Sequence, residues 1–214
     1  MENDMAFINT VSAAEATGKV REMYERQQAA YGFVPHYATI FSHRPEVMQL
    51  WADLQNGIRR HMDKRRFELI TVAAAMAVRS TYCSLAHGRA LTKFHTSREV
   101  RAIVSNSDSN PLTDAEVEMM KFARKVAMQA SDTTEADVAS LKDFGFSDAE
   151  IFDIAATATA RTFFAQLCEG LGTIGDHMYE DMDAELRDAL TVGRPIDRAE
   201  PQMLSPASER VAVA

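Results

Sequence analysis

A cysteine and a histidine, Cys83 and His87, stand four residues apart in an apolar, alanine-rich stretch of the chain. If this stretch is helical, positions i and i+4 share a face, so the thiol and the imidazole can meet across one turn. A thiolate is a nucleophile, and a neighbouring imidazole can take the proton of a thiol. The pair therefore has the minimal composition of an activated cysteine, although a cysteine in a helix is also often inert packing.

A third chemically capable residue, Glu68, precedes Cys83 by fifteen positions. On one straight helix that separation spans about 22 Å, which is too far for the carboxylate to reach the thiol. We therefore expect a helix break near residues 79–81, where Ser80 is a candidate N-cap for a second helix that folds back. Cys83 would then lie in the first turn of the new helix. Without such a break, the glutamate would have to come from a packed partner.

These residues form a pattern that resembles the core motif of the AhpD-like, or carboxymuconolactone decarboxylase, family. In that family a Glu is followed by Cys-x-x-Cys-x-x-x-His. The region from Glu15 to Trp51, with its Gly-Phe-Val-Pro segment, is similar to the peroxidase-related branch of the family, and two later helical stretches resemble its closing helices. The resemblance covers roughly residues 10–178. It implies an all-α, AhpD-like helical bundle whose protomers associate into homo-oligomers, as dimers, trimers or hexamers.

Position by position, the resemblance implies that Cys83 attacks a peroxide, that His87 is its proton-relay partner and that Glu68 is the general base. Ser80 stands where the family has its first, resolving cysteine, and a hydroxyl cannot form a disulfide. A sulfenic acid at Cys83 would then have to be reduced by an external thiol or by Cys168, the other cysteine of the chain.

Three residues beside the motif are candidate neighbours of the site, namely Arg79, Ser80 and Tyr82. Arg79 is a fixed cation that could favour a thiolate or an anionic substrate. A solvated arginine at a helix end is the alternative interpretation.

Two enzymatic functions fit these residues. The first is a thiol-dependent hydroperoxide reductase, which uses a peroxide as substrate and an external thiol as reductant. The second is a lyase or isomerase of the carboxymuconolactone decarboxylase kind, in which His87 and Glu68 act as acid and base on a small organic acid and Cys83 is incidental. A non-catalytic, oligomeric redox sensor is a third hypothesis.

We expect neither a cofactor nor a metal. A metal site made of Glu68, Cys83, His87 and His95 is conceivable from the ligand types. It is disfavoured because only Cys83 and His87 form a close-spaced ligand pair.

Charge and composition exclude several classes of function. The 214 residues include 23 Lys and Arg against 31 Asp and Glu, a formal net charge of -8 that argues against nucleic acid and anionic membranes as partners. The chain lacks a disulfide framework, the first residues lack the features of a signal peptide, and no apolar segment reaches transmembrane length. We therefore expect a cytoplasmic protein.

The chain reads as helical almost throughout, with Asp63 as a predicted N-cap and capping boxes at 113–116 and 147–150.

We predict an N-terminal arm at residues 1–10, an AhpD-like helical domain at 11–178 and a C-terminal extension at 179–214. Because the extension is interrupted by prolines, we expect it to be flexible or to lie on a neighbouring subunit. Trp51 could line a substrate cavity, although a place in the core is favoured. The remaining histidines are expected in loops or on the surface without partners: His36, His43, His61 and His177.

Overall fold

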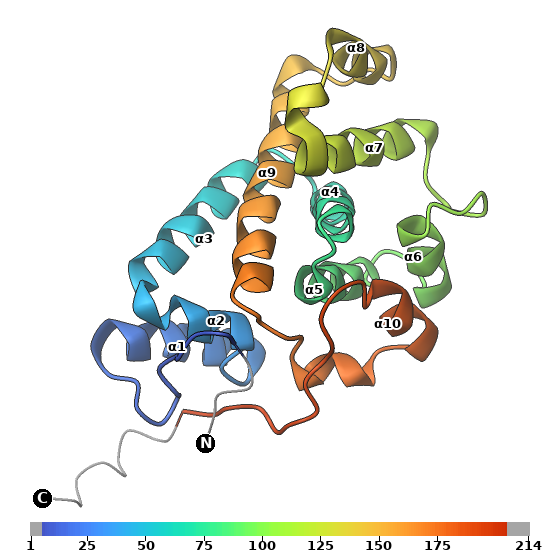
Figure 1. Ribbon diagram of the computed structural model, residues 1–214. Helices are drawn as coiled ribbons and strands as arrows, with labels where there is room; N and C mark the ends of the chain where they lie inside the picture. Colours follow the sequence, from blue (N-terminus) through green and yellow to red (C-terminus); the bar gives the residue numbers. More distant parts are fainter. Residues whose placement is uncertain (1–5, 205–214) are drawn as a thin grey trace, which may run out of the picture.

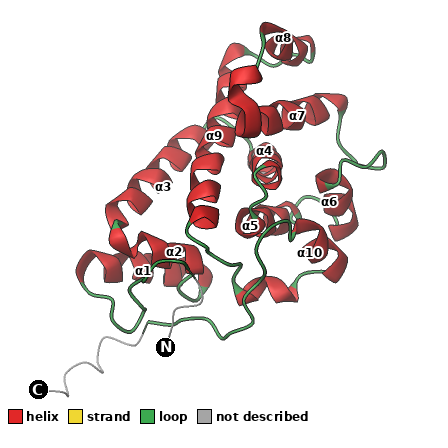
Figure 2. Ribbon diagram, viewed as in Figure 1, coloured by secondary structure: helices red, strands yellow, loops and turns green. Residues whose placement is uncertain are grey.

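The structure is a computed structural model that describes residues 6–204, and these residues form ten α-helices, three short 3-10 turns and one isolated bridge between Gly175 and Ile196 (Figure 1, Figure 2). The predicted all-α class is confirmed. The helices are α1 (Gly18–Tyr31), α2 (His36–Ile40), α3 (Pro45–Arg59), α4 (Lys64–Ala77), α5 (Thr81–Leu91), α6 (Ser97–Val104), α7 (Asp114–Gln129), α8 (Glu135–Asp143), α9 (Asp148–Gly170) and α10 (Ala184–Leu190), and the 3-10 turns are η1 (Phe41–His43), η2 (Ala130–Asp132) and η3 (His177–Asp181). Within residues 6–204, none of these helices combines the length and the apolar character needed to cross a membrane.

Helix α4 lies at the centre of the molecule, with α5, α7 and α9 packed around it (Figure 1). Its small residues Ala73, Ala74 and Ala75 are buried, as close packing between helices requires. One cluster of buried apolar side chains joins these helices to α6 and α10. A second cluster joins α1 and α2 to α5 and α9, and it contains both Cys83 and Cys168. The reactive motif therefore lies inside the fold.

Local capping signals fix where several helices begin. The Asp63 side chain accepts a hydrogen bond from the backbone N–H of Arg66 at 2.9 Å and opens α4, as predicted. The capping boxes that open α7 at Thr113 and α9 at Ser147 are also confirmed. Each box satisfies backbone donors that the first helical turn leaves unpaired.

The predicted break between Glu68 and Cys83 is present. Helix α4 ends at Ala77 and α5 begins at Thr81. Between them, Arg79 adopts a left-handed conformation with φ 57°, which reverses the chain direction. The Ser80 hydroxyl then accepts a hydrogen bond from the Cys83 N–H at 3.5 Å and caps α5. Cys83 thus lies in the first turn of α5.

The segment after residue 178 packs against the helices. Leu186 and Leu190 of α10 are buried beside α5 and α6, and Leu204 is buried in the second cluster. The prediction of a flexible extension is therefore wrong for residues 179–204, because the apolar side chains between the prolines are sufficient to hold it. The rest of the predicted extension, 205–214, lies outside the described residues.

The predicted N-terminal arm is held at its described end. The Phe7 N–H donates to the Leu171 carbonyl at 2.7 Å, and the Arg194 guanidinium lies 4.5 Å from the centre of the Phe7 ring. Residues 1–5 of the predicted arm lie outside the described residues.

Candidate active site

A cavity of about 500 Å³ lies where α3, α4, α5 and α9 meet, and Glu68, Cys83 and His87 all line it. The sequence therefore identified three residues that the fold brings to one place. Aromatic rings form much of the wall, and they come from Tyr31, Tyr37, Trp51, Phe67, Tyr82, Phe164 and Tyr179. Trp51 packs against the second cluster, as expected, and its ring also stacks on Phe164 at 4.3 Å between centres and lines the cavity.

The helix reversal brings Glu68 against His87. The Glu68 Oε2 atom lies 2.5 Å from His87 Nδ1. Because a carboxylate only accepts hydrogen bonds, Nδ1 carries the proton, and the lone pair of the neutral ring is on Nε2. Burial lowers the pKa of His87, the nearby Arg161 cation lowers it further, and the Glu68 carboxylate opposes both effects. His87 is thus held neutral, with Nε2 able to accept a proton.

Cys83 pairs with a residue that the motif does not contain. A guanidinium nitrogen of Arg161, on α9, donates a hydrogen bond to the Cys83 sulfur at 3.6 Å. No hydrogen bond joins Cys83 directly to His87 in the described part of the chain, although the two share the cavity. Proton transfer between them would therefore pass through a molecule bound in the cavity.

Arg161 is an unusual buried cation. Only 5% of its surface is exposed, and it forms no ion pair with a carboxylate of residues 6–204. Its guanidinium lies 5.3 Å from the ring centres of both Trp51 and Phe164, and its Nε atom has no hydrogen-bond partner. A buried charge without a counterion is costly. The arrangement favours a negative charge in the cavity, either on the Cys83 sulfur or on a bound anion.

Of the two interpretations of Arg79, the structure favours an arginine at the end of a helix over a cation in the site. The Arg79 side chain lies outside the cavity and donates from Nε to the Val192 carbonyl at 3.2 Å. Arg161 was missed because it is distant in the sequence from the motif. One signal could have found it, since it is the single charge within the apolar helical run from Ile154 to Leu167.

Several buried polar residues contact Asp176, which also lines the cavity. The Tyr82 hydroxyl donates a hydrogen bond to the Asp176 carboxylate, and the His36 N–H donates to the same carboxylate at 2.9 Å. Burial raises the pKa of Asp176, and it raises the pKa of Tyr82 well above its ordinary value. Tyr82 is thus a neighbour of the site, as expected. His36 was expected in a loop without a partner; it is instead buried between Asp176 and Asp197.

The other candidate neighbour, Ser80, is fully buried as the N-cap of α5. Cys168 is buried in the same cluster as Cys83 and forms no disulfide. Burial raises the pKa of the Cys168 thiol well above its ordinary value, and the neighbouring Cys83 adds to this effect, whereas Arg161 opposes it.

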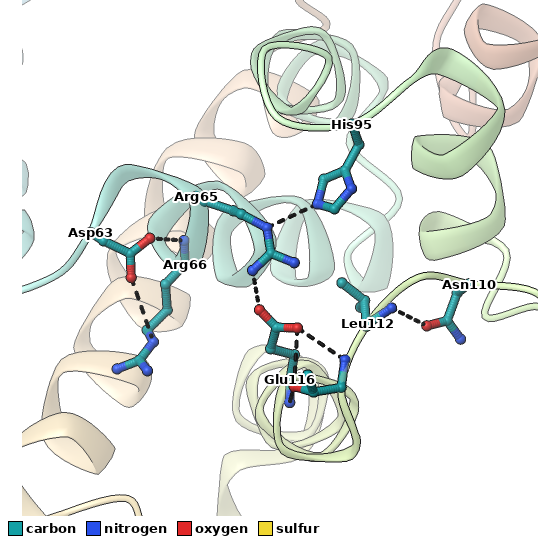
Figure 3. Close-up of polar contacts among 8 residues, drawn as sticks. Asp63, Arg65, Arg66, His95, Asn110, Leu112 and Glu116 are labelled. Atoms are coloured by element: carbon teal, nitrogen blue, oxygen red, sulfur yellow. Dashed lines mark hydrogen bonds and ion pairs between the residues drawn. The ribbon is translucent and has the colours of Figure 1, made fainter.

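Of the four residues considered for a metal site, His95 lies apart from the other three. Figure 3 shows that His95 accepts a hydrogen bond from Arg65 Nε, at 2.9 Å, and that the same guanidinium binds Glu116. His95 does not line the cavity. Among residues 6–204, no group of three or more His, Cys, Asp and Glu residues is placed to hold a metal ion.

Sequence comparison agrees with this geometry. Residues 45–124, which include α4, α5 and the three motif residues, match the sequence profile of the carboxymuconolactone decarboxylase family. This segment of the chain is therefore similar to the family. No curated protein sequence matches the chain significantly.

Several solved structures share the AhpD-like helical fold of this chain. An uncharacterized peroxidase-related protein from Ralstonia eutropha JMP134 has a TM-score of 0.71 at 22% identity, over 89% of this chain and 98% of that one. A peroxidase-related protein from Silicibacter sp. TM1040 has a TM-score of 0.72 at 21% identity, over 83% and 95%. A variant of the debrominase Bmp8 in complex with 2,3,4-tribromopyrrole has a TM-score of 0.63 at 17% identity, over 86% and 97%.

Proposed function

We propose that this protein is a thiol-dependent reductase of organic hydroperoxides that uses Cys83 as its nucleophile. The observation that carries the proposal is the hydrogen bond from the buried Arg161 guanidinium to the Cys83 sulfur. Arg161 has no carboxylate counterion within residues 6–204, so a thiolate at Cys83 would balance its charge. The similarity of the fold to that of two peroxidase-related proteins supports the same reaction class.

In the proposed reaction, His87 Nε2 accepts the thiol proton through a molecule in the cavity, and Glu68 holds the ring in the required tautomer. The Cys83 thiolate attacks the outer oxygen of the hydroperoxide and breaks the O–O bond. The organic fragment leaves as an alcohol after it takes up a proton, and Cys83 becomes a sulfenic acid. Thiols supplied from outside return the enzyme to its starting state.

The cavity supports an organic rather than an inorganic peroxide. A space of about 500 Å³ is in the range of small-molecule sites, and its aromatic wall would bury an apolar fragment. We therefore expect faster reaction with an aromatic hydroperoxide, such as cumene hydroperoxide, than with hydrogen peroxide.

The test is the intact mass of the protein after brief exposure to one equivalent of cumene hydroperoxide in the presence of a sulfenic-acid trap. We expect rapid oxidation of Cys83, detected as the mass of the trapped sulfenic acid or of a disulfide. Replacement of Arg161 by Met should slow it roughly ten-fold or more, because a hydrogen bond to a charged group contributes about 1.5–3 kcal/mol. Arg79→Met is the matched control, since that guanidinium lies outside the cavity. If Cys83 reacts no faster than a free thiol, the proposal fails.

Arg161 also supports a second candidate, because it could bind the carboxylate of a small organic acid. Glu68 and His87 would then act as acid and base in a decarboxylase-type lyase or isomerase reaction. The Cys83→Ala variant separates the two candidates. It should abolish hydroperoxide reduction, whereas acid–base turnover of an organic acid should survive it.

A further inference from the structure

The two cysteines of the chain lie in one buried cluster of side chains. Cys83 lines the cavity, whereas Cys168 does not and is completely buried. Both are free thiols. The proposed function assigns a role to Cys83 alone and so leaves the buried Cys168 thiol unexplained.

Contacts on either side of Cys168 place it next to the first turn of α5. Arg161 reaches the Cys83 sulfur at 3.6 Å, and Cys168 follows Arg161 on α9 by seven residues, which is close to two full helical turns, so both lie on one face. At the end of the same helix, Glu169 forms an ion pair with Arg194 at 3.4 Å, and the adjacent Gly193 N–H donates to the hydroxyl of Thr81, the first residue of α5, at 2.7 Å. Cys168 therefore lies on the face of α9 that meets the Cys83 turn.

The electrostatics of the pair agrees with this placement. After burial, the largest effect that raises the pKa of the Cys168 thiol is the neighbouring Cys83. Because its pKa is raised, Cys168 stays protonated and does not compete with Cys83 for a peroxide.

We propose that Cys168 is the resolving cysteine of this site and forms a disulfide with Cys83 after the peroxide step. The inference rests on the proposed function. The Cys168 sulfur attacks the sulfur of the Cys83 sulfenic acid, an S–S bond forms, and the S–O bond breaks. The sulfenic hydroxyl leaves with the Cys168 proton as water, so the two thiols together supply the two electrons that reduce the hydroperoxide.

This assignment replaces the resolving residue that the motif lacks. Ser80 occupies the usual position in the motif, where its hydroxyl serves as the N-cap of α5. The second thiol is instead supplied by α9, far along the chain. Since Cys168 is closed off from the cavity, an external thiol can reopen the disulfide only by attack on the Cys83 sulfur.

The experiment compares the wild-type protein with Cys168→Ala and Cys83→Ala after one equivalent of cumene hydroperoxide, using intact mass and non-reducing peptide mapping. The wild-type protein should lose two hydrogen atoms and yield one peptide pair linked through Cys83 and Cys168. Cys168→Ala should instead gain one oxygen atom and keep a trappable sulfenic acid on Cys83. The inference is overturned if the wild-type protein also keeps that sulfenic acid beside a free Cys168 thiol.

A second arm uses diamide, which oxidises thiol pairs without any peroxide, on the wild-type protein. A disulfide requires the two Cα atoms to approach within roughly 7 Å, so diamide tests the pairing itself. A Cys83–Cys168 disulfide in diamide supports the pair even if hydroperoxide leaves Cys83 untouched, in which case only the peroxidase proposal fails. Two free thiols after diamide treatment overturn the inference whatever the hydroperoxide does.

Discussion

His87 makes the proposed reaction sensitive to pH. Burial and the Arg161 cation lower the pKa of His87 below its usual 6.5. As pH falls through this lowered pKa, Nε2 becomes protonated and can no longer accept the thiol proton, so the rate of Cys83 oxidation should fall with a midpoint below 6.5. In Glu68→Gln the midpoint should move to still lower pH, because the carboxylate that favours protonated His87 is gone. Stopped-flow oxidation rates across pH measure both midpoints.

The matched comparison is Arg161→Met, which removes a charge that lowers the pKa of His87. Its acidic midpoint should move upward, opposite to that of Glu68→Gln. In a third variant, His87→Gln, the fall in oxidation rate at acidic pH should disappear. If that fall survives in His87→Gln, another group causes it, and His87 is not the proton acceptor.

The site could be predicted from the sequence only where its residues are close along the chain. Cys83 and His87 follow from helical spacing, and Glu68 follows once the helix break is recognised. Arg161 and Asp176 approach the site only through the packing of α9 and the segment behind it. No local pattern encodes such contacts, because they depend on how distant helices meet.

The packing of α5 against α10 depends on a residue with no side chain. A Cβ atom built on Gly88 would lie 2.4 Å from Leu190 Cδ1. Gly88→Ala should therefore push α10 away and lower the free energy of unfolding by about 1–3 kcal/mol, as overpacking does. Urea denaturation measures the difference.

Gly57→Ala is the control for that substitution, because Gly57 lies in α3 with open space at its Cβ position. Replacing a helical glycine by alanine there should raise stability by roughly 0.5–1 kcal/mol. Equal effects of the two substitutions would mean that α10 does not press on α5.

Helix ends were the best-predicted elements of this fold, because capping is encoded within four residues. Asp63, Thr113 and Ser147 all open helices as their sequences indicate. Helix α1 begins at Gly18, and no side-chain cap marks that start. Periodicity marks which residues face the core, but it does not mark where a helix first forms its hydrogen bonds.

The assembly of the whole molecule stays a prediction, and α3 offers a place to test it. Leu50 and Leu54 lie one turn apart on α3 and are more than half exposed. Exposed apolar faces of this kind are typical of subunit contacts. If copies associate here, Leu50→Glu with Leu54→Glu should lower the mass measured by sedimentation velocity. Met128→Glu, at another exposed apolar position on α7, should leave that mass unchanged. An unchanged mass in the double variant would exclude α3 as the interface.

His36 joins the N-terminal part of the chain to the C-terminal segment, and this contact should contribute to the stability of the whole molecule. The His36 ring lies 3.4 Å from the Asp176 carboxylate and 3.3 Å from that of Asp197, and it is buried at the start of α2. His36→Ala would leave two carboxylates facing each other without the imidazole between them. Because breaking a buried pair is strongly destabilising, we expect a loss of about 3 kcal/mol in the free energy of unfolding. His43→Ala, which removes an exposed ring bonded to the Asn9 carbonyl, should cost less than about 1 kcal/mol. Equal losses for the two variants in urea denaturation would mean that the C-terminal segment is held by its buried leucines alone.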